Sequence, residues 1–510
     1  MTDILETAIV SAEQMGQIEE GLFEAGMPVA ALMEKAAGLC SDRLLALYPL
    51  LQISSVGVLV GPGHNGGDAL VMARELYLAG YRVKVYRPFS KLKPLTNAHA
   101  NYVASLGITL DDNIRVLEDC QLIIDGLFGF GLTRPLTGNI LETVEIINSW
   151  LKPVISIDLP SGIHTDTGEV LGGAIRATHT FCLGMWKLAC FQDAALEYLG
   201  NIERIDFGIC PHHVRSVLPQ PPPIRQLTAS IAKKFLPLPR PKVTHKYKQG
   251  KLLLICGSRR YSGGAILTAL GARASGVGML YVAVPESLKP LLVSHLPEAL
   301  IIDCPENKTG AIASLPFSVT DLNDFDTIAC GPGLTLDTNS VVNKVLQAQC
   351  PLILDADGLN ILSELETVST LTAREGQTIL TPHLGEFRRL FPDFEAPERD
   401  RLTAVQTAAT ESGAIILLKG AKTAIADPDG SVWLIAESTP ALARGGSGDV
   451  LTGLMGGLLA QTKSDRQLTP TVATAAWWHA QAGILAAKER TELGVDAVCL
   501  SQYLISVISD

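Results

Sequence analysis

Short apolar runs alternate with amphipathic segments along the chain, and this alternation restricts the possible folds more than any other feature. In the first half, the runs with the length and apolar content of strands are 56–60, 83–86, 122–124, 154–157 and 180–183. The intervening segments with helical periodicity are 69–79, 95–106 and 140–150. Strands and helices in alternation imply a parallel sheet covered by helices on both faces. We therefore predict an α/β fold for this half, with ligands bound at the carboxyl ends of its strands.

The second half shows the same kind of pattern. Its strand-like runs are 251–256, 279–284, 327–330, 352–354, 378–380 and 415–418. A helix is predicted at 266–274 and a hairpin at 424–435. The main glycine-rich loop lies near the start of the first half but near the end of the second. We therefore predict a second α/β domain that does not repeat the internal order of the first.

Two proline clusters, at 218–223 and 236–241, mark the boundary between the halves. Proline-rich segments resist both helix and sheet and act as semi-rigid spacers. A chain of 510 residues is also too long for one ordinary core. We place the domains at 1–222 and 223–510, and we expect the helix-like segment 229–236 to pack on the second domain.

Composition argues against several classes of partner. The net charge is −11 and aromatic residues make up 5% of the chain, whereas a nucleic-acid groove needs a basic face or stacking rings. The ten cysteines form no C-x-x-C pair and lie mostly in apolar runs, as is typical of buried free thiols in a reducing compartment. No secretory signal and no bilayer-length apolar stretch is present. We expect a soluble, cytoplasmic protein without nucleic-acid or membrane partners, and the sequence leaves open whether it forms a homo-oligomer.

Three polar loops follow strands of the first half, at 61–68, 125–135 and 158–162. The first loop, G-P-G-H-N-G-G-D, opens a helix and provides a nest of backbone N–H groups large enough for a phosphate. In the other two loops, Asp125 and Asp158 each end an apolar strand. Each loop alone is equally compatible with helix capping or a tight turn. Their convergence at one edge of a parallel sheet favours a binding site.

These motifs, in the order G-x-G-x-N-G-G-D, D-x-x-F-G-x-G and S-I-D-L-P-S-G, resemble the NAD(P)H-hydrate epimerase domain over residues 1 to about 215. The resemblance implies a Rossmann-like three-layer sandwich with Asp158 as the catalytic acid/base. It also implies a potassium site formed by Asn65, Asp125 and Ser161. The family usually has asparagine where this chain has His64. The residues implied to contact the hydrated nicotinamide nucleotide are His64, Asn65, Gly66, Gly67, Asp68, Gly129, Phe130, Gly131, Leu132, Thr133, Arg134, Pro135 and Asp158.

The second half contains the stretch 444–453, R-G-G-S-G-D-V-L-T-G, which leads into an apolar, helix-forming run. A glycine-rich loop that becomes the first turn of a helix directs free N–H groups outward and is an anion site. Asp449 would lie beside a phosphate bound there, where a carboxylate can act as the base for an attacking hydroxyl. The alternative interpretation is that Asp449 only stabilises the helix N-terminus.

Polar loops also follow the other strands of this half: G-P-G, D-A-D-G-L-N, T-P-H-L-G-E and L-K-G-A-K-T. Together with G-G-S-G-D-V-L they resemble the ADP-dependent NAD(P)H-hydrate dehydratase, a ribokinase-like α/β fold, from about residue 225 to the C-terminus. The resemblance implies that ADP is the co-substrate and that Mg²⁺ accompanies it. The implied contacts to the hydrate are Ala265, Gly333, His383 and the catalytic Asp449. The implied contacts to the nucleotide are Lys419, Gly420, Ala421, Lys422, Thr423 and Gly448.

The chain as a whole is thus similar to the family of bifunctional NAD(P)H-hydrate repair enzymes, which combine an isomerase and a lyase. We expect the first domain to interconvert the R and S hydrates of NADH and NADPH. We expect the second to phosphorylate the C6 hydroxyl of the S hydrate and then eliminate phosphate, giving NAD(P)H, AMP and phosphate. Two alternatives remain open from the sequence: a ribokinase-like kinase of a small alcohol, and a first domain that serves only as an interaction module.

Overall fold

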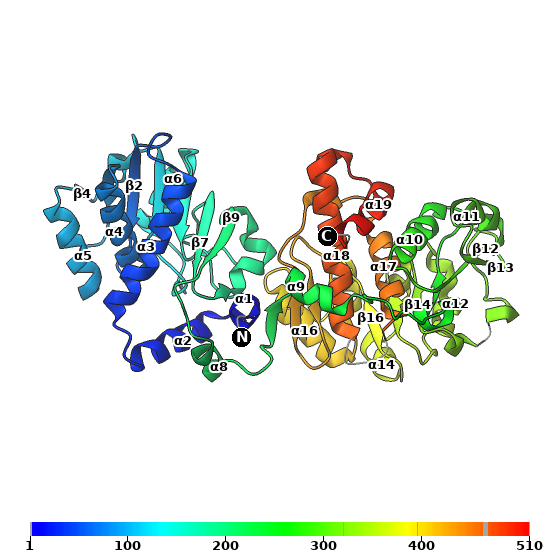
Figure 1. Cartoon of the computed structure of the whole chain (residues 1–510). Coiled ribbons are helices and arrows are strands. Elements are labelled where there is room, and N and C mark those ends of the chain that lie inside the picture. Colours follow the sequence, from blue (N-terminus) through cyan, green and yellow to red (C-terminus); the bar gives the residue numbers. More distant parts are fainter. Residues whose placement is uncertain (1–2, 320, 395, 463–467, 509–510) are drawn as a thin grey trace. The chain divides into compact units, whose positions relative to one another are not determined.

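The computed structural model describes residues 3–319, 321–394, 396–462 and 468–508. The chain divides into two compact units, Met1–Ile224 and Arg225–Asp510, drawn in blue to green and in green to red in Figure 1. The boundary predicted from the prolines lies near residue 222, and the structure divides the chain after Ile224.

Unit 1 contains a seven-stranded sheet in the order β4-β3-β2-β5-β6-β7-β9, with every neighbouring pair parallel. Its strands are β2 (Ser55–Val60), β3 (Arg82–Tyr86), β4 (Leu110–Asp111), β5 (Leu122–Gly126), β6 (Val154–Ile157), β7 (His179–Leu183) and β9 (Asn201–Ile205). The two edge strands β4 and β9 were not predicted. The sequence of β9, N-I-E-R-I, has no apolar run because only its last residue is buried.

Helices cover both faces of this sheet, as the α/β pattern predicts. They are α3 (Val29–Leu47), α4 (His64–Leu78), α5 (Pro94–Ser105) and α6 (Gly138–Ser149), with a short α7 (Leu196–Leu199). Val56 and Val58 of β2 share one core with α3, α4 and α5, whereas Leu59 shares another with Val144 and Ile147 of α6. Successive residues of a strand point to opposite faces, so β2 contributes to both cores. The prediction of a three-layer α/β sandwich is confirmed.

A smaller core lies at the start of the chain. It joins α1 (Asp3–Thr7), α2 (Ala12–Glu24) and α8 (Pro211–Val217) to a two-stranded sheet of β1 (Ile9–Val10) and β8 (Trp186–Lys187). Ser11 caps the N-terminus of α2 with a capping box. The Ser11 hydroxyl accepts from the N–H of Gln14, and the Gln14 side chain accepts from the N–H of Ser11. This cap fixes which face of α2 points inward.

Unit 2 is built on a ten-stranded sheet in the order β10-β19-β18-β17-β16-β15-β14-β11-β12-β13. All neighbouring pairs in the stretch β17-β16-β15-β14-β11-β12-β13 are parallel. The strands β17, β18 and β19 pair in antiparallel fashion. Their bounds are β10 (Ile224–Gln226), β11 (Lys251–Ile255), β12 (Met279–Pro285), β13 (Leu300–Cys304), β14 (Thr327–Cys330), β15 (Leu352–Leu354), β16 (Thr378–Leu380), β17 (Ile415–Leu418), β18 (Ala424–Ala426) and β19 (Val432–Leu434). The predicted hairpin is therefore β18–β19, and the outermost strands β10 and β13 were not predicted.

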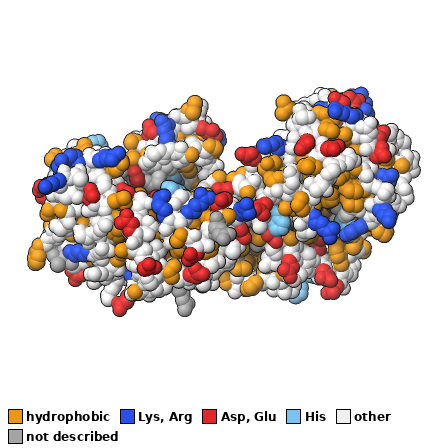
Figure 2. Space-filling view, turned by 180° about the vertical axis from the view of Figure 1, so that it is seen from behind, with side chains coloured by type: hydrophobic (Ala, Val, Ile, Leu, Met, Phe, Trp, Pro, Cys, Tyr) orange, Lys and Arg blue, Asp and Glu red, His pale blue; other side chains and the backbone are white. Residues whose placement is uncertain are grey.

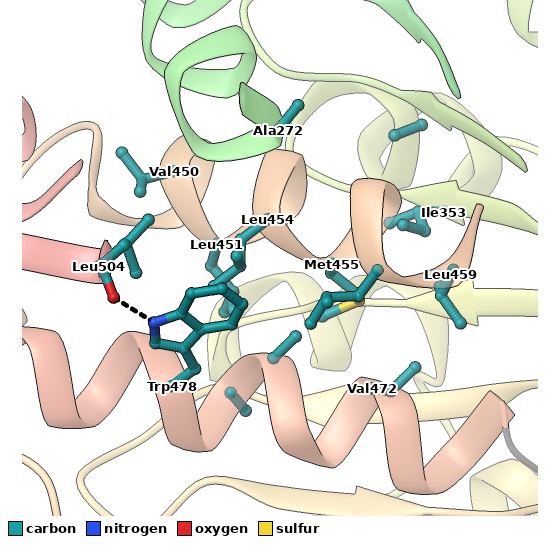
Figure 3. Packing of buried hydrophobic residues seen from close by; sticks show 14 of the residues in the cluster. Ala272, Ile353, Val450, Leu451, Leu454, Met455, Leu459, Val472, Trp478 and Leu504 are labelled. Atoms are coloured by element: carbon teal, nitrogen blue, oxygen red, sulfur yellow. Dashed lines mark hydrogen bonds between the residues drawn. The ribbon is translucent and has the colours of Figure 1, made fainter. Parts of the chain in front are cut away.

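The α-helices of unit 2 are α9 (Ala229–Ala232), α10 (Ser262–Ala274), α11 (Lys289–His295), α12 (Asn339–Val345), α13 (Asp357–Ser363), α14 (Thr367–Thr372), α15 (Leu384–Leu390), α16 (Arg401–Ser412), α17 (Ser447–Leu459), α18 (Leu468–Arg490) and α19 (Ala497–Val507). Figure 3 shows the indole of Trp478, on α18, packed against Leu451 and Leu454 of α17, with its N–H donated to the carbonyl of Leu504. Ile231 and Ala232 belong to the same core, so the segment after the first proline cluster packs on unit 2 as predicted.

Helices α10 and α17 lie side by side in Figure 1 although they are far apart in the sequence. Glycines allow their backbones to touch. A β-carbon at Gly453 would lie 1.7 Å from the carbonyl oxygen of Thr268, and one at Gly271 would lie 2.1 Å from that of Val450. No side chain fits at these positions, so the glycines set the spacing between the two helices.

The surface shows no segregation of side-chain types on the face drawn in Figure 2, where acidic, basic and apolar side chains are interspersed. No helix among the described ranges is long and apolar enough to cross a membrane.

All ten cysteines are free, and eight of them are buried. The prediction of a buried thiol is wrong for Cys210, which is exposed, and Cys350 is only partly covered. Cys210 directly precedes the exposed first turn of α8, which explains its exposure.

Candidate active sites

Unit 1 has a cavity of about 340 Å³ at the carboxyl ends of β2, β5 and β6. Its walls come from the loop and first turn after β2, the loop after β5, Asp158 after β6, and α2. The lining residues are Glu19, Pro62, Gly63, His64, Asn65, Asp68, Lys93, Leu127, Phe128, Gly129, Phe130, Gly131, Leu132, Asp158 and Leu183. The three sequence-predicted loops thus meet at one cavity.

Asp158 is the most tightly held carboxylate of this cavity. It is 3% exposed and has a φ of +70°, a left-handed conformation that is strained for a residue with a β-carbon. Its Oδ2 accepts from the N–H of Phe130 at 2.8 Å, and its Oδ1 accepts from the ammonium of Lys187 at 2.6 Å. The ammonium also donates to the carbonyl of Leu183. A buried lysine at this distance stabilises the ionised carboxylate, which suits a base.

Two other carboxyl groups line the same cavity in a different environment. Burial raises the pKa of Glu19 to about 7, with Lys187 opposing that shift and Asp158 adding to it. Burial also raises the pKa of Asp68 well above its usual value, and the charges of Asp158 and Glu19 add to the effect. Neither group makes a hydrogen bond or ion pair with any residue in the described ranges. The cavity therefore combines one carboxylate paired with a lysine and two carboxyl groups whose pKa values are raised by burial.

Asp125 lies below this cavity and is fully buried. It accepts from the Ser161 hydroxyl at 2.6 Å, the Ser161 N–H at 2.8 Å and the Ser156 hydroxyl at 2.8 Å. Burial raises the pKa of Asp125, and these hydrogen bonds oppose the shift. No cation within the described part of the chain pairs with this carboxylate. Nearby, the amide nitrogen of Asn65 is buried without a partner.

This oxygen-rich set fits a hard cation. An unpaired buried carboxylate is costly, and a bound cation would remove that cost. Carboxylate, hydroxyl and amide oxygens are suitable ligands for such an ion. The structure brings Asp125 and Ser161 into direct contact, and Asn65 reaches the same loop, because a β-carbon at Gly129 would lie 3.2 Å from its amide oxygen and 2.9 Å from Asp158 Oδ2.

The residues predicted to contact the nucleotide divide into three groups. His64, Asn65, Asp68, Gly129, Phe130, Gly131, Leu132 and Asp158 line the cavity. Gly66 and Gly67 lie beneath it: β-carbons there would lie 2.0 Å from the carbonyl oxygen of Gly61 and 2.6 Å from Met33, so these glycines allow close packing of the turn. Thr133, Arg134 and Pro135 are exposed on the continuing loop and do not line the cavity.

Unit 2 has a cavity of about 460 Å³ between the N-terminal turns of α10 and α17. It is lined by Arg260, Tyr261, Gly263, Gly264, Leu267, Gly333, Asp357, Gly445, Gly446 and Asp449. The G-G-S-G-D stretch enters α17 through Gly446, whose φ of +88° is a left-handed conformation. The N–H groups of Gly448 and Asp449 find no acceptor within the described part of the chain. The turn therefore has the free donors of an anion site.

A charged network lies behind this turn. Lys419 donates to Asp355 Oδ1 at 2.8 Å, and the hydroxyl of Thr452 donates to Asp355 Oδ2 at 2.6 Å. Burial raises the pKa of Asp449 to about 7, Asp355 and Asp357 add to this shift, and Lys419 opposes it. A β-carbon at Gly448 would lie 3.6 Å from the Lys419 ammonium. A cation, free N–H groups and a carboxyl that titrates near neutral pH thus meet at one helix start.

His479 of α18 supports the turn from below. Its side chain is buried, and its Nε2 lies 2.9 Å from the carbonyl oxygen of Ser447 and 3.2 Å from the Ser447 hydroxyl. Because a carbonyl can only accept, the Nε2 carries the proton. Burial is the largest cause that lowers the pKa of His479, to about 4, so the ring is neutral near pH 7. It holds Ser447, the first residue of α17, in place.

The predicted nucleotide loop 419–423 follows β17. The buried guanidinium of Arg401 donates to the carbonyl oxygens of Leu418, Lys419 and Lys422 and so shapes this loop from α16. Lys422 donates to the carbonyl of Ala436. Beside it is an open cavity of about 660 Å³ lined by Lys422, Ala436, Glu437, Ser438, Thr439, Pro440, Ile484, Ala487, Lys488 and Glu492. The loop thus extends from the α17 turn, through Lys419, to this cavity, through Lys422.

The other predicted contacts of unit 2 differ in position. Gly333 lines the smaller cavity and has a φ of +68°. Ala265 is fully buried on α10, under Gly257. His383 begins α15: its Nδ1 accepts from the N–H groups of Gly385 and Glu386, while its side chain remains 57% exposed. His383 is not among the residues that line either cavity of this unit.

Sequence reasoning missed three residues that shape these sites, namely Glu19, Lys187 and His479. Glu19 could have been found, because Met15, Ile18, Glu19 and Leu22 follow the i, i+3, i+4, i+7 spacing of an apolar stripe that a carboxylate interrupts. Lys187 and His479 have no such signal, since each is a single polar residue in an otherwise apolar segment.

Two family models match the chain. Residues 29–189 match the model described as the YjeF-related protein N-terminus, and residues 252–506 match the model described as NAD(P)H-hydrate dehydratase. The chain is 58% identical over 498 residues to the bifunctional NAD(P)H-hydrate repair enzyme of Synechocystis sp., covering 98% of this chain and 94% of the relative. It is 48% identical over 514 residues to that of Gloeobacter violaceus, covering 100% and 99%.

Solved structures resemble unit 2. The ADP/ATP-dependent NAD(P)H-hydrate dehydratase from Bacillus subtilis, co-crystallized with ATP/Mg²⁺, is 33% identical and covers 53% of this chain and 92% of its own, with a TM-score of 0.45. A ribokinase-like superfamily protein from Enterococcus faecalis is 27% identical and covers 56% and 95%, with a TM-score of 0.47.

Proposed function

The chain belongs to the family of bifunctional NAD(P)H-hydrate repair enzymes, and from this premise we propose how its two cavities divide the work. The protein repairs hydrated NADH and NADPH: unit 1 carries the epimerase domain, and unit 2, whose fold is ribokinase-like, carries the dehydratase domain. The observation that carries the assignment of the chemistry to unit 2 is the unpartnered Asp449 beside the free N–H groups of the α17 turn.

In unit 1, the hydrated nicotinamide occupies the 340 Å³ cavity. Asp158, held ionised by Lys187, acts as the base at C6, where the R and S hydrates differ. The backbone of the loop from Gly129 and the first turn of α4 hold the nucleotide, with His64 and Asn65 as polar contacts. The exposed residues Thr133, Arg134 and Pro135 contact the part of the dinucleotide that extends out of the cavity.

Potassium is the cation we assign to Asn65, Asp125 and Ser161. When bound, it supplies a fixed positive charge that compensates Asp125 in the buried floor of the site. The hydroxyl of Ser161 also accepts the N–H of Phe128 at 2.9 Å, and so links this floor to the loop after β5. Ordering that loop positions the Phe130 N–H that holds Asp158.

In unit 2, Asp449 takes the proton from the C6 hydroxyl of the S hydrate as that oxygen attacks the terminal phosphate of ADP, which is bound as its magnesium complex. The free N–H groups of Gly448 and Asp449 and the ammonium of Lys419 stabilise charge on the transferred phosphoryl group. Elimination of phosphate then restores NAD(P)H and leaves AMP. Gly333 contacts the hydrate in the cavity, Ala265 supports the cavity wall from beneath, and the exposed imidazole of His383 contacts the part of the hydrate that extends out of the cavity.

We assign the adenosine part of the nucleotide to the 660 Å³ cavity beside Lys422. Gly420, Ala421 and Thr423 contribute backbone and hydroxyl contacts between this cavity and the α17 turn. Arg401 keeps the loop in shape, since a β-carbon at Gly420 would lie 2.3 Å from its guanidinium. The loop therefore has the reach to bind both ends of one nucleotide.

The test is to give the protein both NADH-hydrate epimers with Mg²⁺, K⁺ and either ADP or ATP, and to follow the return of reduced-nicotinamide absorbance. Full, fast recovery with ADP is expected. Recovery of only the S form would contradict the assignment of unit 1. A stable phosphorylated product without NADH would contradict that of unit 2 and favour a simple kinase.

A further inference from the structure

Glu19 is the one residue of α2 that lines the unit 1 cavity. It is placed there by the helix itself, because it shares the inward stripe with Met15, Ile18 and Leu22, which are buried in the small N-terminal core. Its carboxyl has no hydrogen-bond or ion-pair partner within the described part of the chain. A carboxyl group that is carried into a cavity by an apolar helix face and left unpartnered is available to a ligand.

The two carboxyl groups of Glu19 and Asp158 face this cavity from different elements and in different states. Asp158 accepts from Lys187 and from the Phe130 N–H, which leaves it able to accept but not donate a proton. Glu19 has no such hydrogen bond within the described part of the chain, and burial outweighs the opposing charge of Lys187 in setting the pKa of its carboxyl. Acid and base roles are assigned by environments that separate two titratable groups in this way.

We propose that Glu19 is the proton donor of the epimerase reaction, working with Asp158 as the base. This inference rests on the proposed function of unit 1. In the step, the lone pair of the ring nitrogen N1 forms a double bond to C6 as the C6–O bond breaks, and the proton of Glu19 passes to the departing oxygen, which leaves as water. A planar C6 has lost its configuration and can be attacked from either face.

The second half of the step restores the hydrate. Water adds to the opposite face of C6, the double-bond electrons return to N1, and Asp158 accepts a proton from the adding water. Transfer of that proton to Glu19 regenerates the starting states. Atoms and charges balance, and no redox partner is needed. The ionised Asp158 also stabilises the positive charge that develops on the ring.

Asp68 is the competing candidate, since it is buried in the same cavity. It is the fifth residue of α4, directly after the glycine-rich start of that helix, and it is 8% exposed. The carboxyl of Glu19 comes from a separate helix and is not part of the nucleotide-binding turn. We therefore assign Asp68 to binding and Glu19 to proton transfer.

The pH dependence follows from the groups around Glu19. Burial raises the pKa of this carboxyl to about 7, Lys187 opposes the shift, and Asp158 adds to it. The other titratable groups that face the cavity or contact α2 are Asp68, His64, Lys93, His213 of α8, and Asp166, which accepts from the N–H of Ala12. A proton donor must be protonated, so the epimerase kcat/KM should fall as pH rises through about 7.

The test uses Glu19→Gln in the full chain, with Glu20→Gln as the matched control, because Glu20 is the exposed neighbour on the same helix. With the R hydrate as substrate, Glu19→Gln should lower the epimerase kcat by about 10²- to 10⁴-fold, with KM changed little. The fall of activity above neutral pH should disappear. Dehydration of pure S hydrate by the same protein, and both activities of Glu20→Gln, should stay within about two-fold of wild type.

An epimerase kcat within about three-fold of wild type in Glu19→Gln, with an unchanged pH profile, would overturn the proposal. If Glu19→Gln loses the fold of unit 1, Glu19→Asp decides instead: retained activity with a shifted alkaline limb supports a proton donor, and an unshifted limb overturns it. Absence of epimerisation in the wild-type protein would overturn the proposed function of unit 1 itself, which separates that failure from this one.

Discussion

The ammonium of Lys187 lies 2.6 Å from a carboxylate oxygen of Asp158, and the two side chains are 0% and 4% exposed. This is an ion pair withdrawn from water, between Asp158, which follows β6, and Lys187, which lies in β8. Such a pair gains little stability overall, yet removing one partner leaves a buried charge uncompensated. In the function proposed for unit 1 the pair has a further role, since it fixes the orientation of the carboxylate proposed as the base.

Lys187→Met should therefore impair the epimerase strongly. We expect a loss of about 10²-fold or more in epimerase kcat, because Asp158 loses the ammonium that orients it, and unit 1 should lose about 3–5 kcal/mol of stability because the buried carboxylate is left without its partner. The measurement is epimerisation of the R hydrate, with thermal unfolding alongside. Lys91→Met, at an exposed position, is the control. Normal epimerase activity in Lys187→Met would show that Asp158 needs no fixed partner.

Asp449→Asn should abolish the base of the dehydratase while making unit 2 more stable at high pH. Dehydratase kcat/KM should fall by about 10²- to 10⁴-fold. In the wild type it should rise with pH through about 7, where Asp449 ionises. Because the pKa of Asp449 is raised on folding, the wild type loses stability as pH rises towards 7, and Asn avoids this loss.

The variant should accordingly unfold at a higher temperature than wild type at pH 8 and at the same temperature near pH 4. Asp393→Asn, on an exposed turn, is the control and should match wild type throughout. Equal unfolding temperatures at pH 8 would mean that the ionised Asp449 carboxylate does not destabilise the folded protein.

His479→Gln should weaken nucleotide binding without removing a group that contacts substrate. His479 holds Ser447 at the start of the anion-binding turn, so its loss should raise the KM for ADP more than it lowers kcat. The pKa of this histidine is lowered to about 4, so the wild type should lose stability as pH falls from about 6.5 towards 4, and the variant should lose less over that range. His295→Gln, on the exposed end of α11, should behave as wild type. An unchanged KM for ADP would show that ADP binding does not depend on the hydrogen bond by which His479 holds Ser447.

Potassium should stabilise unit 1 through Asp125. At equal ionic strength, KCl should raise the unfolding temperature of the wild type above that in choline chloride, because a ligand that binds only the folded state stabilises it. Asp125→Asn should abolish the difference, whereas Asp112→Asn, at an exposed position, should keep it. A potassium effect that persists in Asp125→Asn would place the ion elsewhere.

Gly453→Ala should damage unit 2 selectively. Its β-carbon would lie 1.7 Å from the carbonyl oxygen of Thr268, so α10 and α17 must move apart, at a cost of about 1–3 kcal/mol or more. Dehydratase activity should fall while epimerase activity is kept. Gly38→Ala, where no atom lies within 4 Å of the new carbon, should be neutral or slightly stabilising.

The sequence predicted most of the strands because apolar runs in a covered parallel sheet are nearly continuous. The strands β14, β15, β16 and β17 match the predicted bounds. In the two large sheets, the strands that were not predicted are β4, β9, β10 and β13, which lie at the edges, where residues remain partly exposed and the apolar signal is lost. The strands β1 and β8 of the small sheet were also not predicted, because each has only two residues.

The sequence predicted the cavity residues that lie on glycine-rich loops and missed those that other elements contribute. The turns that carry Asn65 and Asp449 have distinctive sequences, and the structure places both in cavities. Glu19, Lys187 and His479 come from helices and a short strand whose packing brings them in from elsewhere. The helical spacing shows that Glu19 lies on the inward face of α2, but which cavity it enters, and the positions of Lys187 and His479, depend on tertiary contacts that one sequence does not display.

The contact between α10 and α17 determines the distance between the two helix starts that line the cavity of unit 2. Both helices begin at that cavity, so Gly264 and Asp449 are separated by a distance that two touching backbones determine; a methyl group at Gly264 would lie 3.5 Å from the Asp449 carboxylate. Side-chain rotamers around the cavity can change without altering this opening. The width of the cavity therefore depends on how closely the main chains of the two helices approach, as well as on the side chains that line it.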